Sequence, residues 1–449
     1  MPMASPAEHP GYVPIAEVPC VPAQARVFEQ GWQSWSPTGT YAGDDTSPRP
    51  SSDQVAASCF RVDRPQPESG FQGEGLVVVD PGDGGPVRSW AAPDDGVSDV
   101  PSIRVRAHGD RLIVSSLGAV EETQHAAGDL PAALVAWART VARRRDLAPV
   151  GSLGPGWSSW YGYWNKVTEQ DIADTLTDVE RLALPLEIIQ LDDGYQRAIG
   201  DWLDIRPGFG SLEGVTKRIA DTGRRAGIWL TPFFVAADSL VATEHPDWIV
   251  RGTPAMREWD RDIAVLDVTH PAAAEHLADV FRTLTATGFS FFKIDYCYAG
   301  AHPGGRHADA SGHDAYLAGM RIIRDAVGPD STILGCGAPL LPSVGYVDAM
   351  RVSPDTAVHV EPKSGDISQP SQLGARLAGA AREFLHGRLW VNDPDCLLAA
   401  PHVEDRAGWA DHVATSGGWR CTSDRLADLD EWGIARTHEL LRPSTTPTV

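Results

Sequence analysis

Basic residues are scarce in this sequence. It contains 38 lysine and arginine residues against 60 aspartate and glutamate residues, which gives a formal net charge of −22. Its isoelectric point is about 4.9. A surface with this charge repels the phosphate backbone of nucleic acids, so we expect no nucleic-acid partner.

The sequence also lacks the cysteine spacings of zinc sites and the long apolar runs of membrane spans. Its six cysteines are scattered and include no Cys-X-X-Cys pair, which argues against a zinc site and a disulfide framework. No apolar run approaches the roughly 20 residues of a spanning helix, so we expect no membrane partner. The first residues have neither a basic stretch nor an apolar core, unlike a secretory signal. We therefore expect a cytoplasmic protein.

Tryptophan, in contrast, is abundant. The 449 residues include 15 tryptophans, and 42% of the residues are hydrophobic, as in soluble globular proteins. Some of these indoles must be core residues. Others can form flat walls for the apolar faces of sugar rings, because binding pockets are commonly lined by aromatic side chains.

Residues 1–145 are predicted to form a first domain. Short alternating runs at 75–80, 102–107 and 111–115 are separated by turn residues such as those at 81–85. This pattern is typical of an antiparallel β-sandwich. Residues 127–145 read as a helix that links this domain to the next.

Residues 146–441 repeat an apolar strand, a polar loop and an amphipathic helix, and 442–449 form a short tail. Eight strands separated largely by helices predict an α/β fold, a (β/α)8 TIM barrel. Between the fifth and sixth strands the connection, 337–348, is too short for a full helix with two loops. A long loop at 235–269 carries two tryptophans and is expected to be a lid or rim. The expected strands are 154–160, 186–191, 227–233, 289–294, 332–336, 349–353, 388–391 and 413–416.

The fourth of these strands delivers Lys293 and Asp295 at its end. Side chains alternate along a strand, so the two share one face. They are either a buried structural ion pair or a carboxylate nucleophile kept ionised by a neighbouring cation.

In a barrel of this type the reacting groups lie at the carboxyl ends of the strands, and every expected end here carries a polar or aromatic residue. A metal site would need histidine among the carboxylates, and no strand end supplies one, so we expect no metal and no cofactor. A phosphate site has only the weak candidate Ser416-Gly417-Gly418. Glycoside hydrolysis needs two carboxylates, aromatic platforms and further polar groups for hydroxyls, and it fits best.

Several motifs in chain order resemble those of glycoside hydrolase family 36, the bacterial α-galactosidases, which are similar in fold and mechanism to family 27. A further match lies near the N-terminus, at Gly31-Trp-Gln-Ser-Trp-Ser36. The motifs of the barrel are Gly156-Trp-Ser-Ser-Trp-Tyr161, Gln190-Leu-Asp-Asp-Gly-Tyr195, Gly200-Asp-Trp202, Gly227-Ile-Trp-Leu-Thr-Pro-Phe233, Lys293-Ile-Asp-Tyr296, Cys336-Gly-Ala-Pro339, Arg351-Val-Ser-Pro-Asp355 and Trp390-Val-Asn-Asp-Pro-Asp-Cys396.

The resemblance implies a retaining α-galactosidase that takes a small α-galactoside as substrate. Asp295 matches the nucleophile and Asp355 the general acid/base. The remaining matches are substrate-binding positions: Asp192 and Asp193 for the 4- and 6-hydroxyls, Lys293 near the nucleophile, Cys336 and Arg351 around the 2-hydroxyl, and Trp160, Trp229 and either Trp35 or Trp32 as aromatic walls.

The sequence departs from the family in having a short N-terminal domain and little chain after residue 441, where relatives usually carry a further β-domain. Relatives often assemble through these regions, so the oligomeric state stays open. Some relatives are α-N-acetylgalactosaminidases or galactosyl transferases, and an inactive sugar-binding protein is the alternative from another class. Cys336 with Arg351 favours an unsubstituted 2-hydroxyl.

Overall fold

The computed structural model describes residues 11–50, 52–93, 96 and 98–442. The expected tail thus lies outside the described residues except for Arg442, as do the first ten residues. The chain divides into two compact units, Met1–Trp32 with Ser36–Leu147, and Gln33–Trp35 with Ala148–Val449. Within the described part of the chain, no helix is both long and apolar enough to cross a membrane.

The first unit contains two antiparallel sheets. One has the strand order β1-β8-β7-β4 and the other β3-β2-β5-β6-β9. Their strands are β1 (Val13–Pro19), β2 (Arg26–Glu29), β3 (Gly39–Ala42), β4 (Phe71–Glu74), β5 (Leu76–Asp80), β6 (Val87–Ala91), β7 (Ser102–His108), β8 (Arg111–Leu117) and β9 (Glu121–His125).

The two sheets share one apolar core. Val77 and Val79 of β5 are fully buried together with Phe71 of β4 and Val105 of β7. Two sheets facing each other over such a core form a β-sandwich. The unit also has helices α1 (Asp53–Cys59) and α2 (Leu130–Arg144), and α2 is the helix expected at 127–145.

The second unit is built on an eight-stranded parallel sheet with the order β19-β18-β17-β16-β12-β11-β10-β20. Leu397, just beyond β19, bridges Thr422 of β20, and this contact closes the sheet into the predicted barrel. The strands are β10 (Gly156–Ser158), β11 (Ile188–Leu191), β12 (Arg225–Leu230), β16 (Phe289–Ile294), β17 (Thr332–Gly335), β18 (Ala349–Arg351), β19 (Val391–Asp393) and β20 (Cys421–Thr422).

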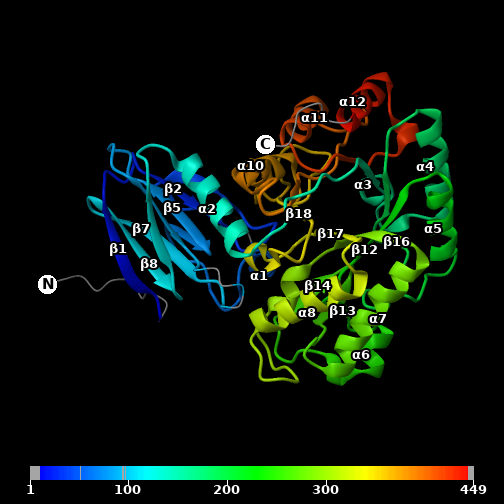
Figure 1. Ribbon diagram of the computed structural model, residues 1–449, viewed down its shortest axis with the longest axis horizontal. Helices are drawn as coiled ribbons and strands as arrows, with labels where there is room; N and C mark the ends of the chain where they lie inside the picture. Colours follow the sequence, from blue (N-terminus) through cyan, green and yellow to red (C-terminus); the bar gives the residue numbers. More distant parts are fainter. Residues whose placement is uncertain (1–10, 51, 94–95, 97, 443–449) are drawn as a thin grey trace. The chain divides into compact units, whose positions relative to one another are not determined.

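Amphipathic helices surround these strands, as Figure 1 shows for α4, α5, α7 and α8. Apart from the single-turn helices α3 and α9, each helix of this unit begins where a side chain accepts from its free N–H groups; Thr168 and Asp171, for example, form a capping box at the start of α4. The helices are α3 (Trp160–Tyr163), α4 (Glu169–Arg181), α5 (Leu212–Asp221), α6 (Leu240–Glu244), α7 (Pro271–Thr287), α8 (Gly312–Val327), α9 (Leu340–Ser343), α10 (Gln372–Ala381), α11 (Arg406–Thr415) and α12 (Glu431–Leu441), with 3₁₀ turns at Trp164–Lys166, Pro246–Trp248, Cys297–Ala301, Glu383–Leu385 and Leu426–Asp428.

Strand β16 pairs with β12 on one side and with β17 on the other. Helix α7 ends at Gly288, whose φ of 111° is left-handed and lets the chain turn directly into β16. Phe291 and Phe292 of this strand are fully buried. Each such ring contributes about 1.5–3 kcal/mol of burial free energy, so the strand that delivers the polar residues is held firmly.

The prediction of the eighth strand was wrong. Residues 413–416 belong to the end of α11 and its C-cap, and the eighth strand is β20, five residues further on. Val413 is buried, so its apolar segment fits a helix that packs on the barrel equally well. The short connection between the fifth and sixth strands, β17 and β18, contains only the single-turn helix α9, as its length required.

The segment expected to be a loop at 235–269 is folded. It contains a three-stranded antiparallel sheet of β13 (Phe234–Ala236), β15 (Arg261–Val265) and β14 (Met256–Glu258), in the order β13-β15-β14. A hairpin joins β14 to β15, with Glu258 paired to Arg261, so its loop is the two residues Trp259 and Asp260.

Candidate active site

The carboxyl ends of the barrel strands surround a small cavity. Eight of the residues predicted for the site line it, although they come from widely separated parts of the sequence. The lining residues are Trp35, Trp160, Asp192, Asp193, Trp229, Trp259, Lys293, Asp295, Tyr296 and Asp355. Carboxylates and indoles therefore share one small space.

Asp295 follows the last residue of β16 and is 7% exposed. Its Oδ2 accepts a hydrogen bond from Trp229 Nε1 at 2.9 Å, and its Oδ1 accepts one from the backbone N–H of Tyr296 at 2.8 Å. Two N–H donors fix the orientation of this carboxylate. Trp229 can donate in this way because it lies opposite Lys293 in the register of β12 and β16.

The alternation of side chains along β16 suggested that Lys293 pairs with Asp295, but its close ion pair is with Asp192. Its Nζ donates to Asp192 Oδ2 at 3.0 Å. Burial lowers the pKa of Lys293, but the Asp192 carboxylate and then that of Asp295 raise it more, so it lies well above its ordinary value. The lysine is therefore charged and links the ends of β11 and β16.

Asp193, next to Asp192, is held by two neutral donors. Gln196 Nε2 donates to its Oδ1 at 2.6 Å, and Trp259 Nε1 donates to its Oδ2 at 2.9 Å. Burial raises the pKa of Asp193 to about 6, against the lowering effect of these hydrogen bonds. Its carboxyl is thus less acidic than an exposed aspartate, and it faces the cavity from the Trp259 side.

Asp355 lies at the end of a buried charge network. Arg351 donates to Asp355 Oδ1 at 2.8 Å and also contacts Asp393 at 2.8 Å and Asp395 at 2.9 Å. Burial raises the pKa of Asp355 to about 7; Arg351 lowers it, and Asp395 and Asp295 add to the rise. The side chain is 29% exposed toward the cavity, so its proton can be exchanged near neutral pH.

Two predicted residues, Cys336 and Arg351, do not line the cavity but lie behind it. Cys336 directly follows β17 and is fully buried; burial and then Asp295 raise the pKa of its thiol well above the ordinary value. Arg351 is the last residue of β18 and orients Asp355 rather than facing the cavity.

Of the two tryptophans predicted near the N-terminus, Trp35 lines the cavity and Trp32 does not. Trp35 packs edge-on against Tyr296, with ring centroids 4.9 Å apart. Arg382 links the segment of Trp35 to the end of β18. It donates to the carbonyl of Gln33 at 3.0 Å and to that of Val352 at 2.7 Å. Trp32 is buried in the first unit, under the guanidinium of Arg61.

Two residues that line the cavity, Trp259 and Tyr296, were not predicted as site residues from the sequence. Both have left-handed backbones, with φ of 52° and 51°. Trp259 and Asp260 are both at positive φ, as in a type I′ hairpin turn, where asparagine and glycine are usual. An indole there stores roughly 1–3 kcal/mol of strain. Asp260 is the one turn-forming residue of this loop, and Trp259 beside it is untypical of a hairpin turn, so the sequence signal is weak.

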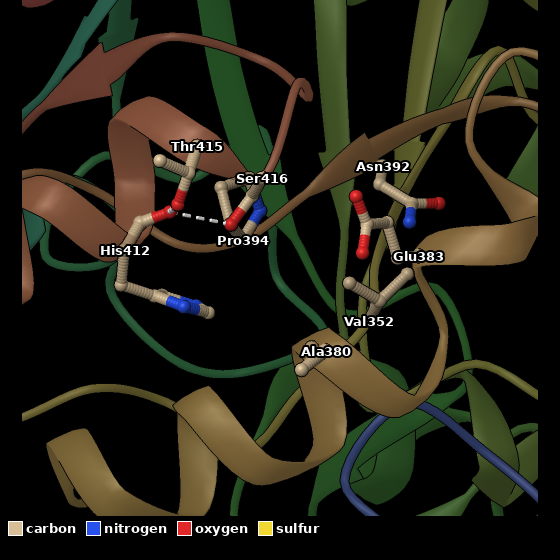
Figure 2. Close-up of a pocket in the computed structure, with 9 residues that line it drawn as sticks. Val352, Ala380, Glu383, Asn392, Pro394, His412, Thr415 and Ser416 are labelled. Carbon is tan, nitrogen blue, oxygen red and sulfur yellow. Dashed lines mark hydrogen bonds between the residues drawn. The ribbon is translucent and has the colours of Figure 1, made fainter.

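A second cavity, of about 500 Å³, lies between α10 and α11 (Figure 2). His412 and Glu383 face it, and Ser416, once a candidate for phosphate binding at a strand end, lines it after α11 instead. Burial and then Arg376 lower the pKa of His412 to about 4, so the ring is neutral. With a single carboxylate and no aromatic wall among its lining residues, this cavity lacks the groups that glycoside hydrolysis needs.

Among the described residues, no group of three or more histidines, cysteines and acids is arranged to hold a metal ion. The first cavity can instead do acid–base and nucleophilic chemistry. It combines an oriented carboxylate with a second carboxyl that titrates near neutral pH, a combination that separates nucleophile and acid roles.

Three comparisons with known proteins find similarity to α-galactosidases. The Melibiase family model matches residues 149–324. The α-galactosidase AgaA of Geobacillus stearothermophilus is 26% identical over 139 residues, which cover 29% of this chain and 18% of that protein. The match thus spans less than a fifth of this curated relative.

The solved structures agree over a larger part of the chain. The structure of TtGalA, the α-galactosidase from Thermus thermophilus, in complex with stachyose has a TM-score of 0.80 and 26% identity, and covers 98% of this chain and 96% of that one. The structure of the family 36 enzyme AgaA has a TM-score of 0.62 at 14% identity, covers 95% of this chain and 61% of that one, and shows the shared fold alone. The chain thus resembles the Melibiase family of α-galactosidases, glycoside hydrolase family 36, by sequence over residues 149–324 and by fold over nearly its whole length.

Proposed function

We propose that this protein is a retaining α-galactosidase, which removes terminal α-linked galactosyl residues from oligosaccharides and other galactosides. The observation that carries the proposal is the pairing of Asp295, oriented by two N–H donors, with Asp355, whose pKa is raised to about 7, in one aromatic-walled cavity. The match to the Melibiase family model and the stachyose complex of the Thermus relative support the substrate class.

The reaction proceeds in two displacements. Asp355, protonated, gives its proton to the glycosidic oxygen while an oxygen of Asp295 attacks the anomeric carbon. The bond to the leaving group breaks, and a galactosyl ester of Asp295 forms. With Asp295 neutralised as the ester, Asp355 takes a proton from water, and the hydroxide attacks the anomeric carbon and releases galactose with its original α configuration.

The other cavity residues bind the sugar in this proposal. Asp192 and Asp193 accept from the 4- and 6-hydroxyls, and Lys293 donates beside the nucleophile. The indoles of Trp35, Trp160 and Trp229 form apolar walls. Cys336 and Arg351, which lie behind the cavity, act on the 2-hydroxyl side. The thiol of Cys336 is uncharged there, because burial raises its pKa.

A panel of p-nitrophenyl glycosides tests the proposal. We expect p-nitrophenol release from the α-galactoside and much slower release from the α-glucoside and the α-N-acetylgalactosaminide. Release from the N-acetylated substrate alone would favour the N-acetylgalactosaminidase alternative, and absence of release from every substrate would favour an inactive sugar-binding protein. Proton NMR of the first product formed, α-galactose rather than β-galactose, tests retention.

A further inference from the structure

Three aromatic residues around the cavity have positive backbone φ angles. They are Trp164 at 52°, Trp259 at 52° and Tyr296 at 51°. Bulky side chains rarely adopt this conformation, and such strain concentrates at functional sites. Trp259 and Tyr296 line the cavity, which accounts for them. Trp164 does not line it, so its conformation requires another explanation.

Trp164 is the C-cap of the short helix α3, with φ of 52° and ψ of −150°, close to a region that is essentially restricted to glycine. Its side chain gains little from burial in return, because the residue is 48% exposed. The indole instead packs edge-on against Trp160, with ring centroids 4.8 Å apart. Since Trp160 lines the cavity, Trp164 extends that aromatic wall outward into solvent.

Trp164 lies on the side of the cavity that holds Asp355. Its ring also packs against Tyr161, at 5.7 Å between centroids. Burial raises the pKa of Tyr161 well above its ordinary value, and the nearby Asp355 and Asp395 carboxylates raise it further. The Tyr161 hydroxyl donates to Asp395 Oδ2 at 2.5 Å. Arg351 contacts both Asp395 and Asp355, so contacts run without a break from Trp164 to Asp355. Trp259, in contrast, holds Asp193.

A general acid protonates the oxygen of the leaving group, so the leaving group must sit beside it. We propose that Trp164, together with the outer edge of Trp160, is the platform for the ring of the leaving group. The inference rests on the proposed function and specifies its substrate class: α-galactosides whose aglycone is a second sugar or an aryl ring, rather than a small or acyclic group. An exposed indole offers such a ring a flat apolar face at little conformational cost.

The experiment compares raffinose, whose leaving group is a disaccharide, with α-galactosyl fluoride, whose leaving group has no ring. For Trp164→Ala we expect the ratio of kcat/KM for raffinose to kcat/KM for the fluoride to fall about 3- to 10-fold, the range that one aromatic contact contributes. Trp164→Phe keeps a ring and is expected to preserve most of the ratio. Melting curves of both variants confirm that the barrel folds.

Equal losses on both substrates would overturn the inference, because they would mean that Trp164 acts only by supporting Trp160. Wild-type rates on both substrates in Trp164→Ala would overturn it as well. Failure of the proposed function looks different: the wild-type protein would then release product from neither galactoside. The wild-type rates therefore separate the two outcomes before any variant is made.

Discussion

The sandwich and the barrel of this protein each contain a pair of interacting carboxyl groups in which burial raises a pKa. In the sandwich, burial raises the pKa values of Glu29 and Glu74 to about 7 each. In the barrel, burial raises the pKa of Asp355 to about 7 beside Asp295. A perturbed carboxyl by itself therefore does not distinguish a site of chemistry from a structural network.

The surroundings of the two pairs make the distinction. Glu29 accepts from the backbone N–H of Gln72 at 2.9 Å, and Glu74 accepts from Ser102 at 2.6 Å and from Gln72 Nε2 at 3.0 Å. These donors come from strands of the sandwich, so the bonds tie its strands together. Asp295 and Asp355 instead face a cavity with aromatic walls. An accessible space, more than a shifted pKa, marks the pair that can reach a substrate.

The largest expected contrast between the pairs is in activity. Asp295→Asn removes the attacking oxygen's charge, and we expect kcat/KM on p-nitrophenyl α-galactoside to fall by about four to six orders of magnitude. The matched change in the sandwich, Glu74→Gln, is expected to leave kcat/KM within about threefold of wild type, since the buried shape and one acceptor remain. Full activity in Asp295→Asn would break the comparison.

Asp355→Ala is expected to have a smaller effect that depends on the substrate. With raffinose, whose leaving group needs a proton, the loss should be about 10²- to 10⁴-fold. With p-nitrophenyl α-galactoside, whose phenolate leaves readily, the first step should lose much less, and azide should restore rate by replacing water in the second step. A loss that is equal on both substrates and insensitive to azide would remove Asp355 from the acid/base role.

The pH dependence of activity follows from the raised pKa of Asp355. In the free enzyme the acid is protonated below about pH 7, so kcat/KM is expected to fall above that pH, by about tenfold per pH unit. Initial rates on raffinose in buffers of constant ionic strength measure this limb. In Asp355→Ala the alkaline limb near pH 7 should be absent; its persistence would assign the limb to another group.

Trp259→Phe tests the strained hairpin. The change removes the N–H that bonds Asp193, a hydrogen bond to a buried carboxyl worth about 1.5–3 kcal/mol, so kcat/KM should fall roughly 10- to 100-fold. The pKa of Asp193 should rise, because this hydrogen bond lowers it. Trp248→Phe is the control, because Trp248 lies in the same segment, 235–269, but does not line the cavity. A loss of similar size in the control would mean that the change acts through the folding of this segment instead.

The smallest expected effect concerns the stability of the sandwich. The folded-state pKa values of Glu29 and Glu74 are raised above the ordinary 4.5, so the folded state binds more protons and its stability falls as pH rises from about 4.5 through 7. We expect the melting temperature to fall by a few degrees between pH 5.5 and pH 8.5. In Glu74→Gln the fall should be smaller. An identical fall would assign it to other groups.

Much of the barrel could be predicted because the buried strands are continuous apolar runs between polar loops. Strand β16 has the predicted bounds, and Asp192, Asp193, Lys293, Asp295 and Asp355 share one cavity as the strand-end argument requires. The eighth strand was misplaced because an apolar stretch as short as that around Val413 suits a helix and a strand equally. β20 has two residues and leaves almost no pattern to detect.

The partners of the charged groups were harder to predict than their positions. Alternation placed Lys293 and Asp295 on one face, yet the ammonium pairs with Asp192 on the neighbouring strand, and the indole of Trp229 takes the place beside Asp295. Sequence spacing along one strand says nothing about which group of the next strand comes nearest. That choice depends on the register between strands.

By itself, the sequence determined the fold class, the family resemblance and the set of polar residues at the strand ends, because apolar periodicity and local motifs are properties of short segments. Only the tertiary structure decided which of the two N-terminal tryptophans lines the cavity, which donors hold each carboxylate, and that a strained hairpin brings Trp259 to Asp193. These features depend on contacts between residues far apart in the chain, whose free energies no local pattern records.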